Sequence, residues 1–214
     1  MPIPSKDATC LSHMLKKDTV NIMRTATVER NTKETQIKAE LNLDGGEVSI
    51  STGIGFFDHM LTAFAVHGGF GLKLNVSGDL NVDTHHTVED TGIVLGTAFK
   101  QALGDMSGIE RYGTFFIPMD ESLAQASLDI SNRPFLVFNA DFKQEKCGDY
   151  ENCVTEEFWR AFAVNGGITL HINVLYGSNA HHEIEAIFKA VAHAMKIAVT
   201  KNVDGSVLST KGVL

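Results

Sequence analysis

An internal repeat constrains the fold of this chain more than any other feature of its sequence. The string AFAVHGG at residues 63–69 returns as AFAVNGG at residues 161–167. A second pattern, HHxxE, begins at His85 and begins again at His181. Two unrelated motifs that recur at nearly the same spacing indicate a duplicated unit. The chain is therefore expected to fold as two similar halves.

The hydropathy pattern predicts the same order of elements in both halves. In the first half, strands are expected at residues 25–43, 48–52 and 72–76, and helices at residues 58–66 and 85–103. The second half repeats this with strands at residues 115–130, 134–142 and 168–174, and helices at residues 156–164 and 181–199. The order ββαβα, present twice, predicts an α+β fold of two sheets. Helices would pack on one face of each sheet, and the two helical faces would pack together.

Composition limits the classes of partner. The chain has 214 residues, of which 43% are hydrophobic, so a sizeable core can be buried. Its net charge of −8 and its lack of a basic stripe argue against a nucleic-acid partner, although small anionic ligands remain possible. No apolar run is long enough to span a bilayer. Three cysteines without a CxxC pair favour a reducing compartment, so a cytoplasmic protein is expected. We expect a mobile tail at residues 1–22, a first half at residues 23–108 and a second half at residues 109–214.

The repeated HHxxE pattern indicates metal binding. On a helix, residues four apart share a face, so His85 can lie beside Glu89 and His181 beside Glu185. A single pair of histidines at a helix start is more often a solvated cap than a metal site. Recurrence at equivalent positions of a repeat favours metal, because chance would have to act twice in register. The pattern predicts a two-metal site, and it leaves open which ligands share each ion.

The repeat also supplies a further ligand for each ion. His59 stands at the start of the first predicted helix, and the 98-residue offset places Glu157 at the equivalent position. Imidazole with carboxylate suits manganese, iron or zinc. The predicted metal ligands are His59, His85, His86, Glu89, Glu157, His181, His182 and Glu185. The remaining histidines occur singly and are interpreted as structural or surface residues; they are His13, His67, His171 and His193.

Five strings resemble one enzyme family. They are GFFDHML at 55–61, DTHHTVED at 83–90, PMDE at 118–121, NAHH at 179–182 and STKGVL at 209–214. From about Arg24 to Leu214, the chain resembles imidazoleglycerol-phosphate dehydratase. The resemblance implies dehydration of D-erythro-imidazole glycerol phosphate to imidazole acetol phosphate in L-histidine biosynthesis. It further implies a fold like ribosomal protein S5 domain 2, two Mn²⁺ ions per active site bound between subunits, and a homo-oligomer of 24 copies.

The resemblance also implies roles for residues that are otherwise uninformative. It assigns the substrate phosphate to Arg111, Arg133, Ser209, Thr210 and Lys211. It assigns proton transfer to Glu34, with Glu89 and Glu185 as further catalytic carboxylates. Family members often carry histidine where this chain has Glu157, which adds a negative charge there.

Two other functions would use the same ligands. A binuclear metallohydrolase would release phosphate, whereas a dehydratase would give a ketone that retains it. A non-catalytic histidine cluster that joins subunits would turn over no substrate.

Overall fold

The structure, a computed structural model, describes residues 23–202 and 205–212, so the predicted tail lies outside the described residues. The first half contains β1 (Thr25–Asn31), β2 (Thr35–Asn42), β3 (Val48–Ser51), α1 (Gly55–Gly68), β4 (Gly71–Gly78) and α2 (His85–Leu103). The second half contains β5 (Tyr112–Met119), β6 (Ser122–Ile130), β7 (Phe135–Asn139), β8 (Lys146–Cys147), β9 (Tyr150–Glu151), α3 (Val154–Gly166), β10 (Ile168–Tyr176) and α4 (Ala180–Ala198).

The two halves build sheets of the same topology. The strand order is β1-β2-β4-β3 in the first sheet and β5-β6-β10-β7 in the second, while β8 and β9 form a small ribbon. Strand β3 pairs parallel to β4 in the first sheet, and β7 pairs parallel to β10 in the second. The α+β class and the pattern of two sheets with helices on one face are confirmed, although the boundary at residue 108 stays a prediction.

One detail differs from the sequence prediction in both halves. Residues 25–43 and 115–130, each expected as a single strand, are antiparallel hairpins. Their turns fall at residues 32–34 and 120–121, where Asp120 has a positive φ of 47°. Each half therefore has two strands where one was expected, and each turn brings a glutamate to the end of its sheet.

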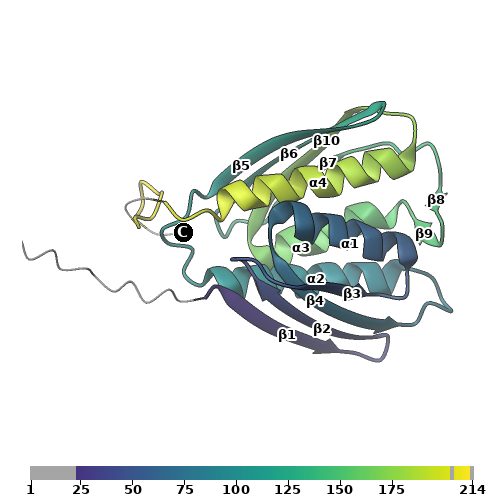
Figure 1. The fold of residues 1–214 in the computed structure, drawn as a ribbon, viewed down its shortest axis with the longest axis horizontal. Coiled ribbons are helices and arrows are strands. Elements are labelled where there is room, and N and C mark those ends of the chain that lie inside the picture. The colour runs from purple at the N-terminus through teal and green to yellow at the C-terminus, as the bar shows by residue number, and fades with distance from the viewer. Residues whose placement is uncertain (1–22, 203–204, 213–214) are drawn as a thin grey trace, which may run out of the picture.

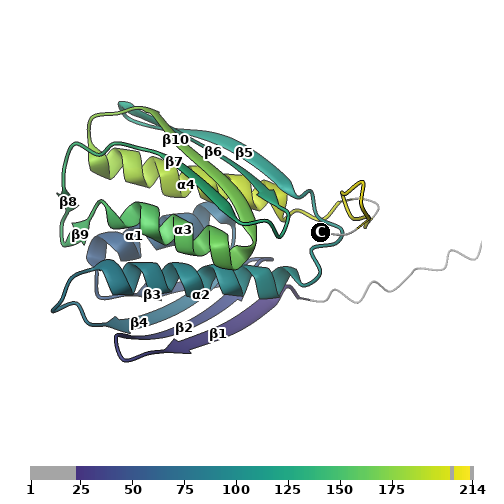
Figure 2. The same ribbon diagram turned by 180° about the vertical axis from the view of Figure 1, so that it is seen from behind.

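The four helices form the middle of the molecule, between the two sheets (Figures 1 and 2). Strand β2 alternates buried and exposed residues along its length, as a sheet with one covered face requires. Helix α2 packs against α3, and α1 packs against α4, so each helix contacts one from the other half. Both halves share one hydrophobic cluster, which includes Phe64, Trp159 and Phe188. No helix among residues 23–202 and 205–212 is both long and apolar enough to traverse a bilayer.

Glycines on α2 permit its close approach to α3. A Cβ atom at Gly92 would lie 2.5 Å from the carbonyl oxygen of Phe158, and one at Gly96 would collide with the carbonyl oxygen of Phe162. Both obstacles are backbone atoms, which cannot rotate away. The spacing between the two halves is therefore set by the absence of side chains at these positions.

Replacing these glycines tests the packing. Gly→Ala inside a helix ordinarily stabilises by about 0.5–1 kcal/mol. We expect Gly92→Ala and Gly96→Ala each to destabilise instead, by roughly 1–3 kcal/mol, because the helices are overpacked. Urea unfolding would measure the effect. Gly55→Ala, with no atom within 4 Å of its added Cβ, is the matched control, and it should cost far less. Equal effects of all three substitutions would contradict this account.

Candidate metal and phosphate sites

Three predicted ligands meet between α1 and α4. His59 Nε2 lies 3.6 Å from Glu185 Oε2, and His181 Nε2 lies 3.3 Å from the same oxygen. Ligand atoms of all three residues lie within 4.8 Å of one another. We call this group the His59 cluster. It joins a histidine of the first half to two ligands of the second, a partition that the sequence left open.

Neighbouring residues hold the His59 cluster in place. Asp58 accepts hydrogen bonds from the backbone N–H and hydroxyl of Thr52, at 2.7 and 2.6 Å, which ties the start of α1 to the end of β3. Asn179 caps α4 by accepting from the N–H of His181. These contacts fix the two helix starts from which the imidazoles project.

A lysine orients the buried carboxylate of the cluster. The Glu185 side chain is only 8% exposed, and Lys189 binds its Oε1 at 2.6 Å, which leaves Oε2 for the imidazoles. Burial alone would raise the pKa of Glu185, but the hydrogen bond and charge of Lys189, with the two histidines, outweigh it and lower that pKa. The carboxylate is therefore held in the charged form that a cation requires.

The equivalent group of the other half is only partly assembled. His85 Nε2 lies 3.4 Å from Glu89 Oε2 on α2. Glu157 stands in the first turn of the adjacent α3, where it pairs with Arg160 at 3.3 Å. In the described part of the chain, the His59 cluster is the one group of three with metal-ligand spacing.

His86 and His182 belong to neither group and are held by carboxylates instead. His86 Nδ1 lies 3.1 Å from Asp79, and His182 Nδ1 lies 2.7 Å from Glu121. These hydrogen bonds are the main reason why the pKa of each histidine is raised, and the same contact lowers the pKa of Glu121 to about 2. A carboxylate on Nδ1 fixes the ring and leaves Nε2 as the nitrogen for a ligand. Asp79 and Glu121 were missed from the sequence, although Glu121 lies within the PMDE string.

All five residues that were predicted to bind phosphate line one cavity of about 780 Å³. It lies at the other end of the molecule from the His59 cluster. We call it the C-terminal cavity. Arg133 extends into solvent there, with its side chain 73% exposed. Arg111 is buried; it binds Asp129 through two nitrogens, at 2.6 and 3.0 Å, and donates to the carbonyl of Leu208 at 2.5 Å. The hydrogen bonds that Arg111 donates to Asp129 raise the pKa of Arg111. Arg111 thus holds the C-terminal segment in place, which a purely phosphate-binding role does not predict.

The His59 cluster and the C-terminal cavity lie near opposite ends of α4, whose course is seen in Figure 1. His181 is in the first turn of α4, whereas the N–H of Arg111 donates to the carbonyl of Ala198 at its last residue. Seventeen residues of α-helix span about 26 Å. A small molecule that is much shorter than this helix cannot contact both sites of a single chain.

Comparison with known proteins decides the family. The family described as imidazoleglycerol-phosphate dehydratase matches residues 52–195. The chain is 56% identical over 194 residues to the imidazoleglycerol-phosphate dehydratase of Lacticaseibacillus casei, covering 90% of this chain and all of that one. It is 57% identical over 191 residues to that of Clostridium acetobutylicum, covering 88% and 97% of the two chains.

Solved structures agree. The crystal structure of the Staphylococcus aureus enzyme matches with a TM-score of 0.77 and 42% identity, over 83% of this chain and 99% of that one. The Pyrococcus furiosus enzyme, solved in complex with (S)-C348, matches with a TM-score of 0.78 and 38% identity, over 87% and 100%. The chain belongs to the imidazoleglycerol-phosphate dehydratase family. The resemblance seen in its strings is confirmed, and the chain is a hydro-lyase of histidine biosynthesis.

Four histidines of the chain are not among the predicted metal ligands. His171 is exposed on β10, and His13 lies outside the described residues. His67 and His193 were interpreted as structural or surface residues, and in the fold they form a pair: His67 Nδ1 lies 3.2 Å from His193 Nε2, and the His193 ring stacks on Phe115 at 4.4 Å. Burial is the largest cause of a lowered pKa in both, and nearby lysines add to it.

The His67–His193 pair should make stability depend on pH. In the unfolded chain both rings take up a proton near pH 6.5, whereas the folded chain resists protonation. The unfolded state then binds more protons, so the free energy of unfolding falls as the pH drops through that value. Between about pH 7.5 and 5.5, Tm of the wild type should fall more steeply than that of His67→Gln/His193→Gln. His171→Gln is the control and should retain the wild-type slope. Parallel curves for the wild type and the double variant would refute the assignment.

Proposed function

We propose that this dehydratase converts D-erythro-imidazole glycerol phosphate to imidazole acetol phosphate in a metal-dependent reaction, with two Mn²⁺ ions per active site. The His59 cluster carries the proposal. Two imidazole nitrogens and a charged carboxylate oxygen surround one point at a spacing that suits a single divalent cation. Manganese accepts this mixture of nitrogen and oxygen ligands, and no thiolate is among them.

The ligands divide naturally into two sets. His59, His181 and Glu185 would hold one ion, and His85, Glu89 and Glu157 would hold the other, since the packing of α2 on α3 mirrors that of α1 on α4. His86 and His182 point to neither set, and their Nδ1 atoms are already engaged. We assign their Nε2 atoms to ions held by neighbouring copies of the chain.

The residues of the chain would divide the chemistry between binding and proton transfer. The two bound ions would act as Lewis acids toward the nitrogens of the substrate ring, which must accept electrons because no carbonyl flanks the hydrogen that is lost. Glu34 would carry the proton, as a carboxylate at the exposed end of a hairpin can. Arg133, Lys211, Ser209 and Thr210 would hold the phosphate, while Arg111 would keep their segment in place.

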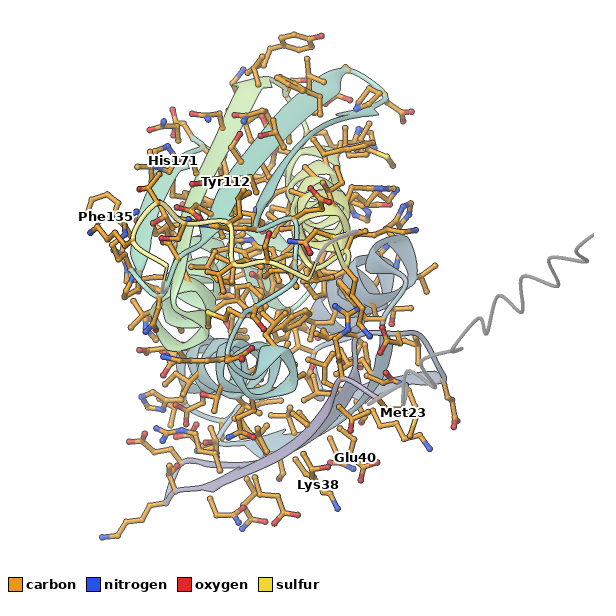
Figure 3. All side chains as sticks on the ribbon, turned by 90° about the vertical axis from the view of Figure 1, so that its left-hand side faces the viewer. Met23, Lys38, Glu40, Tyr112, Phe135 and His171 are labelled. Atoms are coloured by element: carbon orange, nitrogen blue, oxygen red, sulfur yellow. The ribbon has the colours of Figure 1, made fainter. Side chains whose placement is uncertain are left out.

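An active site of this kind requires several copies of the chain. The His59 cluster and the C-terminal cavity of one chain are too far apart for one substrate, so each substrate would bridge two chains. The outer faces of the two sheets also differ (Figure 3). Lys38, Glu40 and Lys73 carry charge on the first, whereas Tyr112, Phe116 and Phe135 are half-exposed or more on the second. We propose a homo-oligomer of 24 copies in the cytoplasm, with the exposed aromatic side chains of the second sheet in a contact between copies.

Metal removal tests the cofactor. Chelation of the purified enzyme should abolish formation of the ketone, and Mn²⁺ should restore it. His181→Ala should lower the bound manganese measured by elemental analysis, because the His59 cluster loses a nitrogen. His171→Ala, which removes an exposed histidine outside the cluster, should keep full metal content. Full activity in rigorously metal-free enzyme would refute the metal dependence.

Mixed assemblies test whether sites are shared. His181→Ala disables the metal site, and Arg133→Ala/Lys211→Ala disables the C-terminal cavity, so neither variant alone should turn over substrate. Co-expressed with separable tags, they should form mixed oligomers that regain part of the wild-type activity, because some sites combine an intact cluster with an intact cavity. Mixing the two after assembly, without subunit exchange, is the control. Mixed oligomers that remain inactive would show that one chain supplies the whole site.

A further inference from the structure

A buried carboxylate links the metal-ligand helix to the turn that carries Glu34. Asp90 follows Glu89 on α2 and is only 8% exposed. Its Oδ2 accepts a hydrogen bond from the hydroxyl of Thr35 at 2.5 Å, and its Oδ1 lies 3.0 Å from Arg30. Thr35 begins β2 and Arg30 lies on β1, so one carboxylate binds both strands of the hairpin next to the turn.

The hydrogen bonds continue from Asp90 to the backbone of Glu34. A carboxylate can only accept, so Thr35 donates to Asp90, and the hydroxyl of Thr32 has two acceptors on Thr35, its Oγ1 at 3.2 Å and its carbonyl oxygen at 3.4 Å. Thr32 Oγ1 then accepts from the N–H of Glu34 at 3.1 Å and from that of Thr35 at 2.9 Å. Thr32 thus contacts Thr35, and Thr35 binds Asp90, so the turn is tied to α2.

The Glu34 side chain, by contrast, is left free. It makes no hydrogen bond or ion pair within residues 23–202 and 205–212. The hydrogen bond with Asp79 is the main cause of the raised pKa of His86, and the negative charge of Glu34 adds to it. Glu34 is therefore held by its backbone N–H, while its carboxylate oxygens can bind a substrate without first breaking other contacts.

The turn before β6 in the second half is not anchored in the way that the turn before β2 is anchored by Asp90. Glu121, which precedes β6 as Glu34 precedes β2, is fully engaged by His182, Ser122 and two backbone N–H groups. The HHxxE patterns begin 96 positions apart, at His85 and His181, so the residue equivalent to Asp90 is Ala186. Its methyl group cannot accept a hydrogen bond from a turn. The two glutamates have therefore diverged. One orients a histidine, and the other is presented free.

We infer that Asp90 and Thr35 are positioning residues, which hold the β1–β2 turn on α2 so that Glu34 stands at a fixed place relative to His85 and Glu89. This rests on the proposed role of Glu34 in proton transfer. Substitutions in the chain of hydrogen bonds should lower kcat without changing KM or metal content, because neither the phosphate residues nor the metal ligands are altered.

Thr35→Val tests this because it removes the hydroxyl and keeps the shape. We expect kcat to fall roughly 10-fold, since a displaced proton-transfer group loses part of its effect. Thr35→Ser retains the hydroxyl and should restore kcat to within about threefold. Thr91→Val, which removes another buried hydroxyl of α2 that bonds only the carbonyl of Thr87, is the matched control. It should lower Tm as Thr35→Val does and leave kcat near wild type.

The Glu34→Gln variant separates the proposed role of Glu34 in proton transfer from the positioning role of Thr35. It should lower kcat by roughly 10²-fold or more while binding metal normally. Adding Thr35→Val to Glu34→Gln should cost little further, because Thr35 acts through Glu34. Near-normal turnover in Glu34→Gln would overturn the proposed role of Glu34 itself. A strong defect in Glu34→Gln with normal kcat in Thr35→Val, or additive losses in the double variant, would overturn the positioning inference alone.

Discussion

The pairing of helices across the two halves is the constraint on which the rest of the structure depends. Because α1 packs on α4 and α2 on α3, the starts of helices from different halves are brought to the same end of the molecule. His59 and His181 come together only for this reason, since nothing in their local sequence connects them. The bare glycine face of α2 sets the distance of one of these pairs. The geometry of the His59 cluster is thus a consequence of core packing, and it should respond to changes in the core that are remote from the cluster.

The sequence predicted elements well wherever a periodicity was uninterrupted. All four helices, and the strands β4 and β10, lie within a few residues of their expected bounds, because burial imposes periods of 3.6 and 2 residues. The hairpins at residues 25–43 and 115–130 were missed because alternation continues through their turns without a glycine signal. The candidate metal ligands were found because the repeat presents them twice, and their role stays a prediction. Asp79, Lys189 and Asp90 were not, because each acts on a side chain that only the tertiary fold brings near.

The C-terminal segment shows a different limit of sequence reasoning. Arg111 was assigned to phosphate, but its buried guanidinium is largely used by Asp129 and the carbonyl of Leu208. An arginine near a phosphate cavity can bind the ligand or build the cavity, and residue type alone does not separate these roles. Burial does separate them. Arg133, which is mostly exposed on the same cavity, retains donors for a ligand, whereas Arg111 stabilises the segment that carries Ser209 and Lys211.

Glu157 differs from its counterpart His59 by carrying a negative charge, which a neighbouring arginine partly balances. Exchanging imidazole for carboxylate adds a second negative charge to the proposed ligand set of His85, Glu89 and Glu157, which would weaken that set when no cation is bound. In this chain Arg160 lies one turn along α3 and pairs with Glu157, as Lys189 lies one turn along α4 and pairs with Glu185. Each set of ligands therefore has a carboxylate whose charge is partly balanced by a helical neighbour. The pairing leaves Glu157 only partly committed, since its contact with Arg160 is exposed and weak. A divalent cation can displace such a contact, so the carboxylate remains competent as a ligand although its site is not preassembled.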